Sequence, residues 1–145
     1  MKRTALALVV LLVAGCSSLP PAPIAVGDTC TQCGRTIRNT RLATEIVDSG
    51  GLAWKFRTAE CMAKYIVSRN PDTAVIYVTD YTTGRLVKAS AVTFVPSMLV
   101  VDGKDKTREY VAYYSSQAAA AAAAREKTTP VEWKQLLESV RASGN

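Results

Sequence analysis

The chain of 145 residues contains no histidine, and this absence limits the chemistry that its side chains can perform. Catalytic triads and acid–base steps that need an imidazole are excluded. A metal site in this chain must use sulfur and oxygen ligands. The 12 acidic residues are also too dispersed to predict a pair of catalytic carboxylates. We therefore expect a protein that is not an enzyme.

The sequence also lacks a long hydrophobic run at its start. The apolar stretch at residues 4–14 is only about 11 residues long, whereas a helix that spans a bilayer needs about 20. Lys2 and Arg3 precede this stretch. A positive start followed by a short apolar run predicts a secretory signal peptide, which we assign to residues 1–15.

The apolar stretch ends at Val13-Ala14-Gly15-Cys16, where a small residue directly precedes a cysteine. This run resembles the lipobox of bacterial lipoproteins, in which the cysteine is acylated and becomes the first residue. An ordinary signal peptide with a chance cysteine is the alternative. Acylated Cys16 would anchor the chain to a membrane, because several acyl chains hold a protein stably where one does not. Ser17 follows in place of an aspartate, which by resemblance favours the outer membrane, facing the periplasm of a bacterial cell envelope.

The next segment, residues 16–28, contains Pro20, Pro21 and Pro23 and shows no periodic hydrophobic pattern. This composition predicts a semi-rigid tether that lifts the folded part off the lipid surface. The folded part is expected to be one small domain over residues 29–143.

The charge of the chain is positive, with 18 basic residues, 12 acidic residues and a net charge of +6. The basic residues are scattered, apart from Arg35, Arg38 and Arg41. This distribution predicts a solvated surface that favours anionic lipid or an acidic partner, and we expect no nucleic-acid partner.

Strands and helices can be assigned from hydrophobic periodicity and turn residues. In residues 53–57, Trp54 and Phe56 alternate with basic residues, so both aromatic side chains are core candidates. A helix over 59–69 begins after Thr58, a plausible N-cap. Thr129 is the expected cap of a last helix that has Pro130 at its first position. The remaining expected elements are strands at 42–47, 74–78, 85–88, 91–95 and 109–114 and a helix at 118–124. Residues 98–101 are expected to extend the strand at 91–95 after a break at Pro96.

The order of these elements predicts the fold class. Strands and helices do not alternate as parallel βαβ units, which predicts an α+β fold. We expect a small antiparallel sheet with helices, arranged as two β-β-α-β-like halves.

Three cysteines of the folded part indicate a site for a soft metal. Cys30 and Cys33 form a Cys-x-x-Cys turn, and Cys61 lies in the first turn of the predicted helix. The helix N-terminus and the nearby arginines favour thiolates. Two or three thiolates suit Cu(I), which accepts soft donors at low coordination number, and Met62 or Met98 could add a thioether.

Other uses of these cysteines remain open. A Cys30–Cys33 or Cys30–Cys61 disulfide would staple an exported domain that docks a partner, and it would leave one odd thiol. Structural zinc would need a fourth ligand, for which Asp28 is available. A thioredoxin-like redox pair would use Cys30 and Cys33, although the motif does not lie between a strand and a helix here.

Several motifs follow one another in a specific order. An aromatic strand runs into a Cys-Met helix at residues 55–66, and a turn of the form Tyr-Val-x-Asp-Tyr-x-x-Gly closes residues 76–84. Together with residues 30–34, residues 88–91 and the lipobox, they resemble the NosL-like lipoproteins, the accessory proteins of nitrous oxide reductase gene clusters and their relatives. The resemblance covers residues 30–124 and implies an α+β domain that binds Cu(I) through Cys and Met side chains.

The chain departs from this family at two places. Arg35 occupies the position at which the family's cysteine pair continues to methionine, and Thr107-Arg108-Glu109 stand where a Pro-Met-Gly run is usual. The resemblance carries over Cys30, Cys33 and Cys61, and Met62 by position. It implies a metallochaperone or copper buffer that passes Cu(I) to a recipient metalloprotein of the envelope. A zinc-binding lipoprotein is the alternative in the same class.

Overall fold

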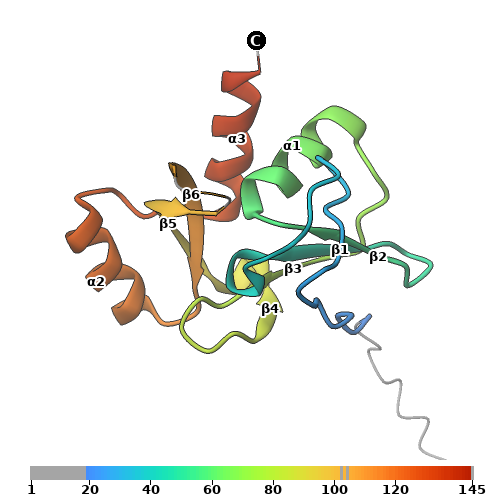
Figure 1. Cartoon of the computed structure of the whole chain (residues 1–145), viewed down its shortest axis with the longest axis horizontal. Coiled ribbons are helices and arrows are strands. Elements are labelled where there is room, and N and C mark those ends of the chain that lie inside the picture. Colours follow the sequence, from blue (N-terminus) through green and yellow to red (C-terminus); the bar gives the residue numbers. More distant parts are fainter. Residues whose placement is uncertain (1–18, 102, 104, 145) are drawn as a thin grey trace, which may run out of the picture.

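The computed structural model describes residues 19–101, 103 and 105–144 (Figure 1). The predicted leader and Cys16 lie outside the described residues. Within the described part, no helix is both long enough and apolar enough to cross a bilayer. Helices and antiparallel strands make up the fold, which confirms the predicted α+β class.

Two sheets form the framework of the domain. The first has the strand order β2-β1-β3-β4, and the second is the hairpin of β5 and β6. The strands are β1 (Thr44–Val47), β2 (Ala53–Phe56), β3 (Val75–Thr79), β4 (Leu86–Lys88), β5 (Thr93–Val100) and β6 (Lys106–Tyr113). The helices are α1 (Ala59–Arg69), α2 (Ser116–Glu126) and α3 (Trp133–Ser143), with short 3-10 helices at Thr40–Leu42 and Ala89–Ala91.

Both predicted β-β-α-β halves can be recognised in the topology. In the first half, β1, β2 and α1 are followed by β3, which returns beside β1. In the second half, β5, β6 and α2 are followed by Val131, whose N–H and C=O exchange hydrogen bonds of 2.8 Å with Phe94 of β5. The returning strand of the second half is thus reduced to a single bridge.

The helix α1 begins and ends at the residues that the sequence predicts. The Thr58 hydroxyl accepts a hydrogen bond from the N–H of Cys61, which caps the helix N-terminus. At the other end, Asn70 adopts a left-handed conformation with φ of 45°, and Pro71 follows it. The local signals therefore fix the element that carries one of the candidate ligands.

Pro96 does not break β5, contrary to the sequence prediction. The strand continues through Pro96 to Val100 and pairs Pro96 with Tyr110 of β6. The Pro96 carbonyl accepts a hydrogen bond from the Thr128 hydroxyl on the open side of the hairpin. An edge strand tolerates proline where no ladder N–H is needed, and the hairpin has that freedom.

The last helix begins three residues later than predicted. Its N-cap is Glu132, which forms a capping box with Gln135, and the helix starts at Trp133. Pro130 and Val131 instead remain extended, because both backbone groups of Val131 are bonded to β5. A long-range strand contact overrides the local signal of Thr129 and Pro130.

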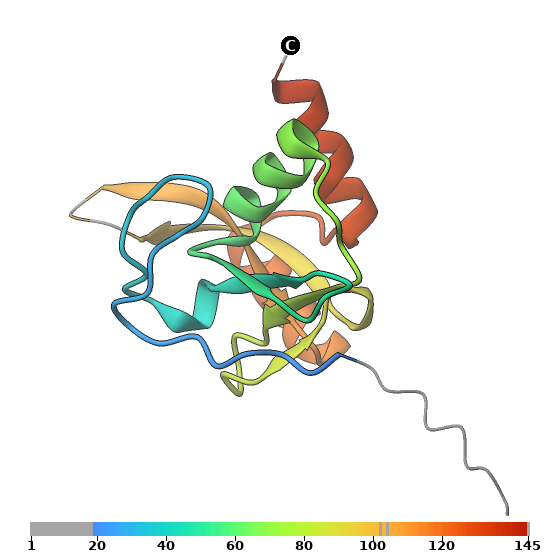
Figure 2. The same ribbon diagram turned by 90° about the vertical axis from the view of Figure 1, so that its right-hand side faces the viewer.

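Two cores hold the sheets and helices together. The first lies between the four-stranded sheet, α1 and α3, and includes Ile46, Phe56 and Met62, all of which are fully buried. Figure 2 shows α1 and α3 side by side above this sheet. The second core lies between the hairpin and α2, whose small buried alanines allow close approach to the strands.

Trp54 lies at the margin of the first core, although the sequence predicts it inside. Its side chain remains 36% exposed, whereas Phe56 on the same strand is completely buried. Trp54 belongs to the edge strand β2 and lies next to the β1–β2 turn. Trp54 is therefore not one of the residues of the buried core.

The proline-rich segment from residue 19 to residue 28 lies against the first sheet. The Tyr77 hydroxyl donates a hydrogen bond of 2.6 Å to the Leu19 carbonyl, and Lys55 donates one of 2.7 Å to the Pro23 carbonyl. In Figure 2 this blue segment runs along the face of the sheet opposite α1 and α3. The domain boundary predicted at residue 28 is thus crossed by several contacts.

Asp80 links the two sheets. Its carboxylate accepts hydrogen bonds from the Thr83 N–H and hydroxyl, and also from the N–H of Tyr114 at the end of β6. Burial raises the pKa of Asp80, but these hydrogen bonds outweigh it and hold the pKa below its ordinary value of 3.8.

Replacing this carboxylate should destabilise the whole domain. We expect Asp80→Ala to lower the free energy of unfolding by about 2 kcal/mol, because two partly buried N–H groups and the Thr83 hydroxyl lose their charged acceptor. In the parent protein this stabilisation is present above pH 3.8 and is lost as the pH falls through the lowered pKa. Urea unfolding at several pH values measures both effects, with exposed Asp105→Ala as the control. Equal stability of the two variants at pH 7 would contradict the assignment.

Candidate metal centre

A short hairpin-like loop positions the first two cysteines. Thr29 and Thr36 form an antiparallel bridge, and inside it the Cys30 N–H donates to the Arg35 carbonyl at 2.9 Å. The Gly34 N–H donates to the Cys30 carbonyl at 2.9 Å, and Gly34 has a φ of +70°, a conformation that favours glycine. The loop therefore turns tightly enough for both sulfurs to reach the same side.

The strand β2 fastens this loop to the sheet. The N–H of Thr31, which lies between the two cysteines in the sequence, donates to the carbonyl of Lys55 near the end of β2 at 2.8 Å. Buried Ile37 anchors the far side of the loop, where its N–H donates to the Asp28 carbonyl at 2.7 Å. The Cys-x-x-Cys turn is thus held from both ends.

Cys61 approaches from the helix that follows β2. After Phe56 the chain needs only Arg57 and the cap Thr58 before α1 begins. Cys61 then lies in the first helical turn, and its backbone N–H is bonded to the Thr58 hydroxyl at 3.2 Å. The same strand end that holds the loop therefore also places the third cysteine.

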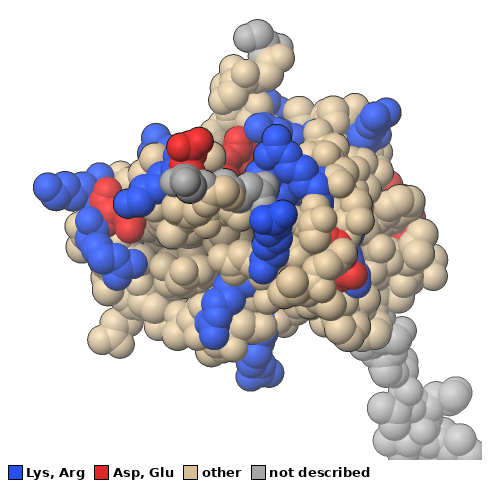
Figure 3. Space-filling view, viewed as in Figure 1, with Lys and Arg blue, Asp and Glu red and all other residues tan. Residues whose placement is uncertain are grey.

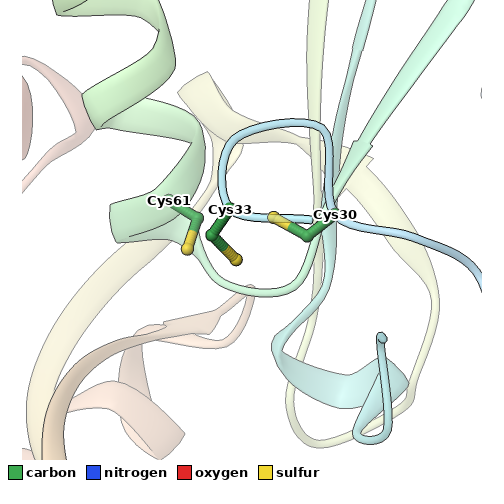
Figure 4. Close-up of side chains that lie close together, drawn as sticks. All are labelled: Cys30, Cys33 and Cys61. Carbon is green, nitrogen blue, oxygen red and sulfur yellow. The ribbon is translucent and has the colours of Figure 1, made fainter. Parts of the chain in front are cut away.

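The three sulfur atoms converge on one point (Figure 4). The Sγ atoms of Cys30, Cys33 and Cys61 all lie within 4.8 Å of one another. A trigonal site with metal–sulfur distances of about 2.3 Å separates its sulfurs by about 4 Å. Side-chain shifts smaller than about 1 Å would therefore close these thiols around an ion.

The cysteines differ in exposure, and all three are free thiols. Cys30 is buried, with 1% of its surface exposed, while Cys33 is exposed and Cys61 is intermediate. The site therefore has a closed inner side and an open outer side, and Cys33 lies on the open side.

Negative charge is concentrated on Cys30. The Cys61 thiol donates a hydrogen bond that lowers the pKa of Cys30 to about 5; burial opposes this effect, and backbone N–H groups of Arg57, Cys33 and Gln32 reinforce it. The pKa of Cys61 is raised, because its proton is held by Cys30 and because the thiol is buried. At neutral pH, Cys30 and Cys61 therefore share one negative charge.

This distribution corrects the expectation that the helix N-terminus makes Cys61 the thiolate. The hydrogen bond between Cys30 and Cys61 is the largest cause of the pKa shift at both cysteines. Arg41 is engaged elsewhere, where its guanidinium donates to the Thr82 carbonyl at 2.9 Å. Backbone N–H groups of Arg57, Cys33 and Gln32 help to lower the pKa of Cys30.

The two candidate methionines lie in different surroundings. Met62 is completely buried in the core that also contains Cys30. Met98 lies on β5 opposite Arg108 of β6, and 50% of its surface is exposed. The structure thus brings the three cysteines together, while the role of either thioether stays a prediction.

Asp28 does not complete a four-ligand site. Its carboxylate forms an ion pair of 2.7 Å with Lys55 and accepts a hydrogen bond from the Ala25 N–H. Lys55 is the main cause that lowers the pKa of Asp28. Among the described residues, no carboxylate oxygen belongs to the group formed by the three sulfurs.

Glu109 is a buried residue near the site that sequence reasoning missed. It is 5% exposed, its Oε1 accepts a hydrogen bond from the Thr107 hydroxyl, and Oε2 has no hydrogen-bond partner. Burial raises the pKa of Glu109, and the negative charge of Glu60 adds to this effect. Thr107, Arg57 and Thr58 act in the opposite direction and lower the pKa. Glutamate is rarely buried, and Glu109 stands at the edge of an expected strand. Its burial could therefore not be predicted from the sequence.

Comparisons with known proteins identify the fold. No protein-family model matches the chain, and no curated protein is similar to it in sequence. The crystal structure of the copper chaperone NosL from Shewanella denitrificans is similar, with a TM-score of 0.65 and 11% sequence identity. The likeness covers 81% of this chain and 95% of that chain. The chain thus has a NosL-like fold, as the sequence motifs imply.

The charge on Cys30 can be measured directly. We expect the thiolate absorption of the metal-free protein to show a step near pH 5, the lowered pKa of Cys30. Cys61→Ala should move this step to higher pH, because it removes the hydrogen-bond donor. Cys33→Ala is the matched control and should move it less, since Cys33 acts through its backbone N–H. A step that stays in place in Cys61→Ala would show that another group stabilises the thiolate.

Proposed function

We propose that this protein is a lipid-anchored periplasmic metallochaperone that binds Cu(I) through Cys30, Cys33 and Cys61. It delivers copper to a metalloprotein of the cell envelope or buffers the ion for it. The observation that carries the proposal is the convergence of three sulfurs from two distant segments. The likeness to a protein described as a copper chaperone supports the choice of metal.

The ligand set favours Cu(I) over zinc. Structural zinc sites almost always have four protein ligands, and the group found among the described residues has three. Soft thiolates at low coordination number suit Cu(I). Zinc remains the alternative ion, and it would need a fourth ligand from solvent or from a partner.

The exposure pattern supports transfer by ligand exchange. A thiolate or thioether of the recipient would bond to copper as the bond to exposed Cys33 breaks, and Cys33 would then take a proton from solvent. Cys30, which is buried, would leave last. No electron is transferred, because the ion stays Cu(I) throughout, and no reaction on an organic substrate is involved.

The thioethers have a secondary place in this proposal. Met62 shares a core with Cys30, and Met98 lies on the exposed hairpin. Either could join the copper ion when its geometry changes, but neither is needed to form the three-sulfur group.

The proposed location is the periplasmic face of the outer membrane, with acylated Cys16 as the anchor. The partners in this proposal are the membrane and a recipient metalloprotein, without nucleic acid. Figure 3 shows Lys and Arg side chains spread over the visible face, with acidic side chains between several of them.

Titration of the reduced protein with Cu(I) against a competing chelator tests the copper site. One tightly bound equivalent is expected, and Cys30→Ser, Cys33→Ser and Cys61→Ser should each weaken it by at least about tenfold, since each removes a soft ligand. Met62→Leu and Met98→Leu are matched controls of similar volume and should each have a smaller effect. Affinity that survives all three cysteine variants would rule out the site.

The redox state in the cell distinguishes the docking alternative. A disulfide-stapled docking lipoprotein would have oxidised cysteines in the envelope and would bind Cu(I) weakly. A copper carrier is expected to show free thiols or bound copper when it is purified without oxygen. Trapping of thiols in intact cells, followed by mass spectrometry, measures this state and also reports whether Cys16 carries acyl chains.

A further inference from the structure

The segment at residues 19–28 is clamped along one face of the first sheet. Three neighbouring side chains in the order Lys55, Glu45 and Tyr77 lie across β2, β1 and β3 in register. Glu45 is completely buried, and its Oε1 accepts a hydrogen bond of 2.8 Å from the Ala22 N–H. Tyr77 and Lys55 hold the carbonyls on either side, at Leu19 and Pro23. The start of the described chain is therefore fixed to the sheet.

This clamp places Leu19 beside the β1–β2 turn. A methyl group at Gly51 in that turn would lie 3.9 Å from Cδ2 of Leu19. Two large apolar side chains of the same turn region are exposed, Leu52 at 56% and Trp54 at 36%. In Figure 1 the β1–β2 turn is at the right-hand edge, and the first described residues, in blue, lie on the same side.

The proposed anchor lies close to the tip of the β1–β2 hairpin, which carries apolar side chains on both faces of the sheet. Leu19 lies on the face that Lys55 shares, and Trp54 lies on the opposite face, which it shares with Phe56. Only three residue steps separate Cys16 from Leu19, and they span at most about 11 Å. An acyl group on Cys16 would therefore bring Leu19, Leu52 and Trp54 to the lipid surface. Tryptophan favours the boundary between lipid and water, where its ring is buried and its N–H can still find a partner.

We propose that Leu19, Leu52 and Trp54 form a seat by which the domain rests on the lipid surface. This inference rests on the proposed acylation of Cys16 and adds a fixed orientation to it. The acidic groups at the turn are Asp48, which is within 3.4 Å of Trp54 Nε1, and Asp72, which bonds to Ser49. The seat therefore holds through apolar contact rather than through attraction to anionic headgroups.

The seat determines which way the metal site faces. The turn lies at the start of β2, whereas the Cys-x-x-Cys loop and Thr58 lie at its end. Four strand residues advance the chain by about 13 Å. The three thiols thus lie at the end of β2 away from the lipid, where a recipient protein can reach them.

The test uses the full-length acylated protein in phosphatidylcholine vesicles whose acyl chains carry bromine, which quenches tryptophan fluorescence. We expect a loss of Trp54 fluorescence that is larger for bromine near the headgroup than for bromine deep in the chain. Trp54→Phe assigns the signal, because Trp133 is the only other tryptophan of the chain. Leu52→Asp should remove the loss. Tyr114→Asp is the matched control at an apolar residue with 62% exposure, and it should leave the loss unchanged.

The outcomes separate the seat from the proposed function. An acylated protein whose Trp54 fluorescence is unaffected by bromine overturns the seat, as does quenching that Leu52→Asp does not reduce. A mass spectrum without acyl chains on Cys16 overturns the anchoring together with the seat. Cu(I) affinity is measured on the same preparations, and Leu52→Asp is expected to leave it unchanged. A parent protein that does not bind Cu(I) would contradict the copper function and would leave the seat unaffected.

Discussion

The end of strand β2 is the constraint on which the rest of the structure depends. The Lys55 carbonyl accepts the hydrogen bond that fastens the Cys-x-x-Cys loop to the sheet. Three residues later, Thr58 caps α1 and so fixes the turn that carries Cys61. The Cys-x-x-Cys loop and Cys61, which are about 30 residues apart in sequence, thus depend on one short stretch of backbone. A change in β2 would move both parts of the site relative to each other.

This arrangement explains how the charge is distributed over three thiols that lie so close together. Like charges repel in a buried site, so three thiolates could not share this space. The hydrogen bond between Cys61 and Cys30 leaves one negative charge on that pair, and backbone amides around Cys30 stabilise it. Binding of a cation would then release protons from the remaining thiols. The absence of histidine places this entire exchange on sulfur.

Much of the fold and each part of the three-cysteine group could be predicted because their signals are local, whereas the meeting of the parts depends on β2. Thr58 and Asn70-Pro71 define α1, and the cysteine spacing defines the loop. The errors arise where a distant segment decides the outcome. Val131 is extended because β5 takes its backbone groups, and Pro96 stays in β5 because its side of the hairpin needs no ladder N–H. Glu109 is buried by packing that no sequence period reveals.

The face of the first sheet opposite the helices shows the same limit of local signals. Prolines without a hydrophobic period predict a semi-rigid tether that lifts the domain off the lipid, yet Glu45 and Tyr77 bind the backbone of this segment from two different strands. These side chains lie in line only after β1 and β3 pair, so their common role has no signature in the sequence. Lys55 contacts both the proline-rich segment and the metal-site loop. Its ammonium group binds Asp28 and the Pro23 carbonyl, and its own carbonyl accepts the hydrogen bond from Thr31 in the loop. One residue of β2 therefore contacts both the start of the described chain and the loop that carries Cys30 and Cys33. These contacts fix the position of the metal site relative to the segment that leads to the proposed anchor.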